Sequence, residues 1–87
     1  MVERVYEIKS SVKPTKGARY HRGSTSSAMD AAVRMSAGNG GIPVYLYPTY
    51  YGIQMTTDEG NTAMAPTTIV TARYKAGVYS VTVQLPE

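Results

Sequence analysis

The chain has no cysteine, tryptophan or phenylalanine, and its one histidine is His21. The absence of cysteine excludes disulfides, thiolate catalysis and zinc sites that need sulfur ligands. A single histidine leaves few nitrogen ligands for a structural metal site, and no second base or converging acid can be assigned to it. We therefore expect no metal, no cofactor, no catalytic residue and no enzyme activity. A small nuclease toxin using Lys, Arg, Tyr and His21 is the third-ranked alternative.

Long hydrophobic runs are also absent. No stretch of about 18 apolar residues is present to form a membrane helix. No charged segment followed by an apolar stretch marks a secretory signal. We therefore expect a cytoplasmic protein that does not contact a membrane.

Large aliphatic side chains are few: nine Val, four Ile and two Leu in 87 residues. This composition predicts a single small domain over residues 1–87 with a small core. A net charge of only +3 and eight Tyr argue that the chain folds. The candidate core comprises Val5, Ile8, Met29, Ala32, Val33, Val44, Leu46, Val70, Ala72, Val81 and Val83.

A short helix is the clearest local signal. Residues 24–27 read Ser-Thr-Ser-Ser, and Ser27 with Asp30 approximates a capping box. Residues 28–37 contain neither Gly nor Pro, and a glycine-rich stretch follows. One helical face carries Met29, Ala32, Val33 and Ser36. Its small residues predict close packing on a sheet.

Strand signals lie on both sides of this helix. Residues 2–12 predict a first strand, 14–17 a turn, and Arg19 with Tyr20 a short return strand that completes a hairpin. Residues 42–47 and 51–56 predict one strand broken at Pro48 or two strands joined by a bend. Residues 58–61 predict a further turn.

The last two strands are predicted over residues 67–74 and 78–85. A two- or four-residue loop places Tyr74 opposite Tyr79 and all apolar side chains on one face. The sequence thus predicts a small α+β fold: a hairpin, one helix, then a three- to four-stranded antiparallel meander, with the helix on one sheet face. The other face is expected to be uncovered and to carry Tyr45, Tyr47, Thr71, Arg73, Ser80, Thr82 and Gln84.

Positive charge is concentrated near the start of the chain. Residues 9–22 contain no acidic residue, and they include Tyr20, His21 and five cations: Lys9, Lys13, Lys16, Arg19 and Arg22. Such a segment suits contact with phosphates or with acidic protein surfaces. Backbone N–H groups at residues 23–25 can add a phosphate site at the helix start. The alternative is a solvated segment that keeps the protein soluble.

Tyrosine gives a second candidate site. Tyr45, Tyr47, Tyr50 and Tyr51 fall within seven residues around Pro48. Tyrosine concentrates at interfaces because it supplies a large contact area and a polar tip. Strand alternation prevents all four rings from lying in one core, so we expect at least one to anchor a partner or a second copy of the chain. The alternative is that tyrosine replaces phenylalanine as core filler.

The order of elements, with the helix phrase Ser-Ser-Ala-Met-Asp-Ala-Ala at residues 26–32, resembles small phage-encoded anti-CRISPR inhibitors. It is also similar to small modules such as HicB-type antitoxins. The resemblance implies a non-enzymatic inhibitor that occludes a site on a larger protein or ribonucleoprotein complex, in the host cytoplasm. The alternative function is a nucleic-acid or nucleotide-phosphate binder using residues 9–22. The candidate binding residues are Lys13, Lys16, Arg19, Tyr20, Arg22, Tyr45, Tyr47, Tyr50 and Tyr51.

Overall fold

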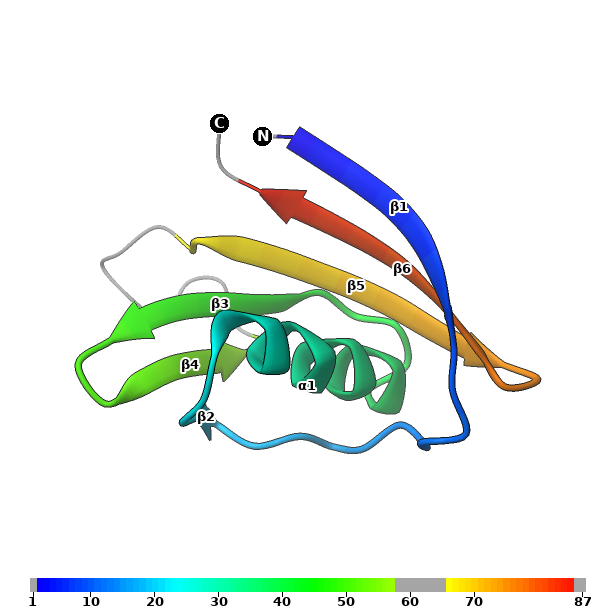
Figure 1. Ribbon diagram of the computed structural model, residues 1–87, viewed down its shortest axis with the longest axis horizontal. Helices are drawn as coiled ribbons and strands as arrows, with labels where there is room; N and C mark the ends of the chain where they lie inside the picture. Colours follow the sequence, from blue (N-terminus) through cyan, green and yellow to red (C-terminus); the bar gives the residue numbers. More distant parts are fainter. Residues whose placement is uncertain (1, 58–65, 86–87) are drawn as a thin grey trace.

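The computed structural model describes residues 2–57 and 66–85 and shows an α+β protein (Figure 1). One helix packs on a six-stranded antiparallel sheet, so the predicted fold class is confirmed. The elements are β1 (Val2–Lys9), β2 (Tyr20–His21), α1 (Thr25–Gly38), β3 (Val44–Thr49), β4 (Gly52–Thr56), β5 (Thr68–Lys75) and β6 (Val78–Leu85). The turn predicted at residues 58–61 lies outside the described residues. No helix among the described residues is long and apolar enough to cross a membrane.

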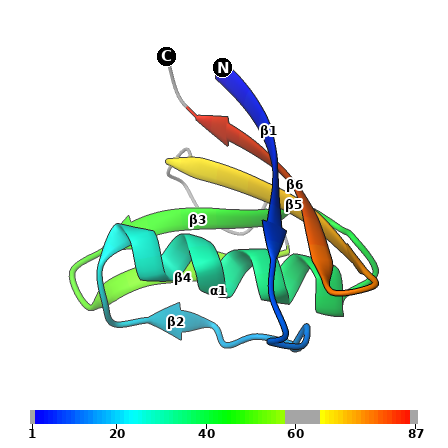
Figure 2. The ribbon, with the colours of Figure 1, turned by 45° about the vertical axis from the view of Figure 1, so that its right-hand side comes forward.

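The sheet order is β1-β6-β5-β3-β4-β2, which makes the predicted N-terminal hairpin wrong. β3 lies between β4 and β5, so the later strands do not follow the simple meander order that was predicted. β1 pairs with β6, and β2 pairs with β4 at the opposite edge. Residues 10–19, here named the strap, run past α1 from one edge to the other (Figures 1 and 2). Gly17 does take a positive φ of 82°, but within this strap, where a Cβ would meet the Met35 side chain.

The predicted position of the helix and its predicted buried face are both confirmed. Ser24 is the N-cap, and its side chain accepts a hydrogen bond from the Ser27 N–H at 3.2 Å. The cap is therefore one of the candidates at residues 24–27, whereas Ser27, suggested with Asp30 as a capping box, lies inside the helix. The buried helix residues are Ala28, Ala32, Val33, Met35 and Ser36, and Met29 is half-buried.

Ser36 joins the helix to the sheet at a gap in the hydrogen-bond ladder. The pairing of β3 with β5 ends at Val44 and Val70. Two residues further along β5, the Ala72 N–H donates to the Ser36 hydroxyl at 2.8 Å. That hydroxyl donates to the Ile42 carbonyl at 2.6 Å. A fully buried side chain thus satisfies two backbone groups that the sheet leaves unpaired.

The final hairpin confirms the predicted even-numbered loop. Ala76 and Gly77 form it, with φ values of 52° and 77°, as two-residue hairpin turns require. Tyr74 faces Tyr79, as predicted. Ala72 faces Val81 and Val70 faces Val83, so the register matches the prediction throughout.

The core also matches the prediction except at Val5. Val33, Val44, Leu46, Val70, Ala72, Val81 and Val83 are buried with Ala32, and Ile8 and Met29 pack against them. Val5 is 74% exposed, so its predicted core position is wrong. Val5 lies on an edge strand. Side chains alternate along a strand, so Val5 lies on the sheet face opposite α1, whereas Tyr6 and Ile8 lie on the face that carries the helix. On that opposite face Tyr47 is only 1% exposed, so the prediction of an uncovered face is also wrong there.

Candidate binding surfaces

The turn between β3 and β4 presents two tyrosine rings to solvent. Thr49 pairs with Gly52, which leaves Tyr50 and Tyr51 as the turn. Their side chains are 95% and 71% exposed, and the rings contact each other edge to face at a centroid distance of 5.2 Å. The Thr49 hydroxyl donates to the Gly52 carbonyl at 2.7 Å and accepts from the Tyr51 N–H at 3.2 Å. The backbone of this tip is therefore fixed while both rings project.

β2 passes directly behind the tip. Gly52 has a φ of 131°, and a Cβ there would lie 2.5 Å from the His21 carbonyl oxygen and 3.5 Å from the Arg22 Cα. Only glycine permits this approach, which brings Arg22 next to the tyrosine turn. On β2 itself, Tyr20 is 45% exposed. The fold thus joins parts of the two predicted sites into one corner surface.

This corner surface, as defined here, comprises Arg19, Tyr20, Arg22, Tyr50 and Tyr51. The Arg19 guanidinium lies 5.8 Å from the centroid of the Tyr20 ring. All five side chains are exposed. Two cations and three aromatic rings are therefore exposed along β2 and the adjoining β3–β4 turn, and Arg22 is the cation nearest the turn.

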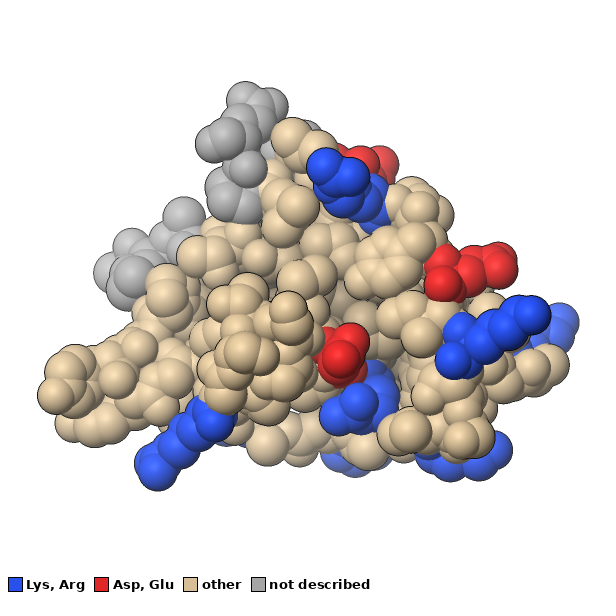
Figure 3. All heavy atoms as spheres, in the orientation of Figure 1, with Lys and Arg blue, Asp and Glu red and all other residues tan. Residues whose placement is uncertain are grey.

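The strap displays the remaining predicted cations from a firmly held backbone. Its first half is held by two backbone bonds: the Ser10 N–H donates to the Gly77 carbonyl at 2.9 Å, and the Thr15 N–H donates to the Arg34 carbonyl at 3.2 Å. Its second half accepts two bonds: the Asn39 side-chain amide donates to the Lys16 carbonyl at 3.3 Å, and the Met55 N–H donates to the Arg19 carbonyl at 2.8 Å. Lys13 and Lys16 are exposed. The Lys13 ammonium lies 5.7 Å from the Tyr74 ring centroid. Figure 3 shows Lys and Arg along the lower margin, where Figure 1 draws the strap.

Tyr45 and Tyr47 lie away from the corner surface, on the sheet face opposite α1. Tyr47 is buried and so is not available as a binding anchor. Tyr45 is half-buried in a shallow groove of ≈ 400 Å³ that also contains Ile69 and Thr71. The predicted tyrosine cluster is therefore divided, and only Tyr50 and Tyr51 are exposed.

His21 and Ser27 form a pair that the sequence did not indicate. The His21 Nε2 lies 2.7 Å from the Ser27 hydroxyl, which also donates to the Ser24 carbonyl at 3.0 Å. The first helical turn brings Ser27, six residues along the chain, against the His21 ring. The contact ties β2 to the start of α1. At the same helix start the Ser27 N–H is bonded to the Ser24 side chain, and the phosphate site at the N–H groups of residues 23–25 stays a prediction.

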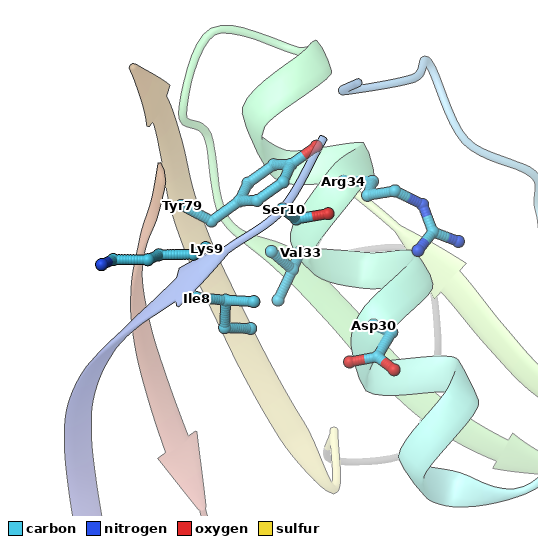
Figure 4. A pocket seen from close by; sticks show the side chains of 7 residues that line it. All are labelled: Ile8, Lys9, Ser10, Asp30, Val33, Arg34 and Tyr79. Atoms are coloured by element: carbon cyan, nitrogen blue, oxygen red, sulfur yellow. The ribbon is translucent and has the colours of Figure 1, made fainter. Parts of the chain in front are cut away.

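A small pocket of ≈ 180 Å³ lies between α1 and the end of β1 (Figure 4). Asp30 and Arg34 of the helix line it together with Ile8, Ser10 and Tyr79. Burial raises the pKa of the Tyr79 hydroxyl, Tyr74 raises it further, and Arg34 opposes the shift. Sequence reasoning missed this pocket because it depends on how β1 and the strap pack beside the helix.

Searches against protein-family models, curated proteins and solved structures found no match to this chain. Among the described residues, no cluster of three or more His, Asp or Glu side chains is placed to hold a metal ion.

Proposed function

We propose that this chain is a non-enzymatic binding protein that inhibits a larger protein or ribonucleoprotein complex by occluding a site on it. The observation that carries this proposal is the pair of tyrosines at 95% and 71% exposure on a hydrogen-bonded hairpin tip. Large exposed rings on a fixed backbone lose little conformational freedom on binding. They are the kind of side chain that dominates interface energetics.

The chemistry around the tip defines the complementary site. Tyr50 and Tyr51 fit an apolar recess. Arg22 beside them, and Arg19 further along the same edge, fit acidic groups at its rim. Inhibition by occlusion needs only such contacts and no reacting group. It is also the mode implied by the resemblance to phage-encoded anti-CRISPR inhibitors. That resemblance now rests on the helix and the strands after it, since the N-terminal hairpin is absent. The cytoplasm remains the expected compartment.

Alanine variants of the tip test this proposal. The partner is first captured from host lysate with and without nuclease treatment, and its affinity for purified chain is then measured by calorimetry. Tyr50→Ala or Tyr51→Ala should weaken binding about thirtyfold or more, the effect of losing an aromatic anchor. Ile42→Ala, at the other end of the helix and 43% exposed, is the matched control and should bind like the parent. Parent-like affinity in both tyrosine variants contradicts the proposal.

The second candidate function is binding to nucleic acid or a nucleotide phosphate through the strap and the start of β2. The observation in its favour is a fixed backbone that displays Lys13, Lys16, Arg19 and Arg22 to solvent. Because exposed charges are screened over about 8 to 10 Å, this function predicts strong salt dependence. The double variant Arg19→Glu with Arg22→Glu should then abolish capture of nucleic acid. Capture that survives nuclease and is equal in low and high salt argues against it.

A further inference from the structure

The outer edge of β1 is long, exposed and partly apolar. Among the described strands β1 has only one neighbour, β6, and seven of its eight residues are exposed. Val2, Val5 and Tyr6 are 46%, 74% and 37% exposed, with Val5 on one sheet face and Val2 and Tyr6 on the other. Unpaired edge strands offer backbone groups to another strand. In Figure 1 no ribbon of the described chain lies beyond this edge.

The pairing with β6 fixes which backbone groups face outward. The Ser10 N–H donates to Gly77, on the same register that pairs Lys9 with Val78. Because N–H and C=O groups alternate sides along an antiparallel strand, the even-numbered residues of β1 point theirs to β6. Glu3, Val5, Glu7 and Lys9 therefore direct their N–H and C=O groups to the free edge.

We infer that a second copy of this chain binds there, by antiparallel pairing of β1 with β1 about a twofold axis through Tyr6. Such an axis, perpendicular to the sheet, keeps both helices on the same face, so directly opposed residues must have numbers of equal parity. It joins two six-stranded sheets into one continuous sheet. Since α1 packs on β3, β4, β5 and β6, the helices of the two copies remain apart.

The charges of β1 select this register over its neighbours. With Tyr6 opposite Tyr6, Glu3 of each copy faces Lys9 of the other and no like charges are opposed. Centring the pair on Val5 opposes Glu3 to Glu7, and centring it on Glu7 or Arg4 opposes that residue to itself. Centring the pair on Glu3 also opposes Glu3 to itself. Centring it on Ile8 leaves only three residues of each β1 strand paired. Of the registers with a long overlap, the one centred on Tyr6 is thus the register that opposes no like charges.

Charge exchange between Glu3 and Lys9 tests the register directly. The parent should dimerise in sedimentation velocity between about 1 µM and about 1 mM, the range of ordinary weak to moderate association. Glu3→Lys alone opposes two positive charges where the parent has an ion pair, and Lys9→Glu alone opposes two negative charges there. Each reversal acts at two symmetric contacts, so the dissociation constant should rise about tenfold or more in each variant.

An equimolar mixture of the two single variants is the decisive measurement. In the mixed dimer one contact opposes the two substituted side chains and the other opposes the two parental ones, so both again join opposite charges. We expect association to return to the parent level on mixing. The double variant Tyr50→Ala with Tyr51→Ala should remain dimeric, which separates this interface from the tip. A parent that stays monomeric at about 1 mM, or single variants that dimerise as well as the parent, overturns the inference. Circular dichroism checks that each exposed-site variant is folded.

Discussion

The two edges of the sheet are built in opposite ways. β1 runs for eight residues and is held in the sheet mainly by its ladder with β6. β2 has only two residues, and much of what holds it lies outside the ladder. His21 contacts Ser27 at 2.7 Å, and the Arg19 carbonyl bonds to Met55 just before the strand begins. A short, tied edge offers no template for another strand, whereas a long open one does.

This contrast separates the two binding surfaces proposed above. At the β2 edge the tertiary ties hold the backbone still, and the exposed side chains of the corner surface are the proposed recognition elements. At the β1 edge the backbone itself is available, and alternating charges restrict what can pair with it. One small sheet therefore carries a side-chain surface and a backbone surface at opposite ends.

The largest loss of stability is expected from Gly38→Ala, which disturbs the packing of the strap on the helix; this strap leads to the β2 edge. A Cβ at Gly38 would overlap the carbonyl group of Thr15. Alanine in a helix normally gains about 1 kcal/mol over glycine, but here the overlap is with backbone and we expect a net loss of about 3 kcal/mol. The measurement is urea unfolding.

Gly40→Ala is the matched control for that variant. It has a positive φ of 82° but nothing within 4 Å of its Cβ position, so only backbone strain of about 1 to 2 kcal/mol is expected. If Gly38→Ala is as stable as the parent, the strap does not pack on the helix as described.

A smaller effect should separate the core from the open edge. Val81→Ala, at 1% exposure, should lower the free energy of unfolding by about 1 to 3 kcal/mol through lost contacts and the cavity left behind. Val5→Ala removes the same atoms at 74% exposure and should cost less than about 0.5 kcal/mol. Both are measured at a protein concentration low enough to exclude self-association. Equal losses in the two variants contradict the assignment of β1 as an exposed edge.

The parts of the fold that the sequence predicted are those fixed by neighbouring residues. Serines before an alanine-rich run located the helix, and the small residues at Ala32 and Ser36 identified its buried face. The Ala76–Gly77 loop was predictable because any odd-numbered loop would have split the apolar residues of β5 and β6 between two faces. In each case the signal and the structure it specifies lie within a few residues of each other.

The partner of β1 was not predictable in this way. Its alternation of apolar and charged residues fits any antiparallel neighbour, and β6 lies more than sixty residues away in sequence. Pro14 and Gly17 indicate a turn equally well whether the chain reverses or crosses as a strap. Because the neighbour of β1 in the sheet was not predictable, its exposed position at the edge was missed and Val5 was assigned to the core. For the candidate site, the sequence predicted residues but not their arrangement. Arg22 lies beside the tyrosine tip because β2 pairs with β4, more than thirty residues away in sequence, and strand alternation alone did not indicate that Tyr47 is buried.

The smallest expected effect distinguishes how the two ends of the strap are held. Near β1, the Tyr79 hydroxyl donates to the Val12 carbonyl at 2.5 Å, and the neighbouring Tyr74 hydroxyl donates to the Ser10 carbonyl at 2.9 Å. Near β2, the tie is a backbone N–H of Met55, which does not titrate. Of these ties, only those at the β1 end are therefore made by titratable side chains.

Burial, with a smaller contribution from Tyr74, raises the pKa of Tyr79 above its ordinary value of 10.0. The folded chain therefore holds this proton more tightly than the unfolded chain. The stability that Tyr79 contributes is complete below pH 10 and is lost as the pH rises through the folded-state pKa. Urea unfolding at a series of pH values above 10 should show this loss, and Tyr79→Phe should make the decline shallower while costing about 1 kcal/mol at neutral pH. An equally steep decline in Tyr79→Phe would mean that other groups account for it and that this hydroxyl does not hold the strap.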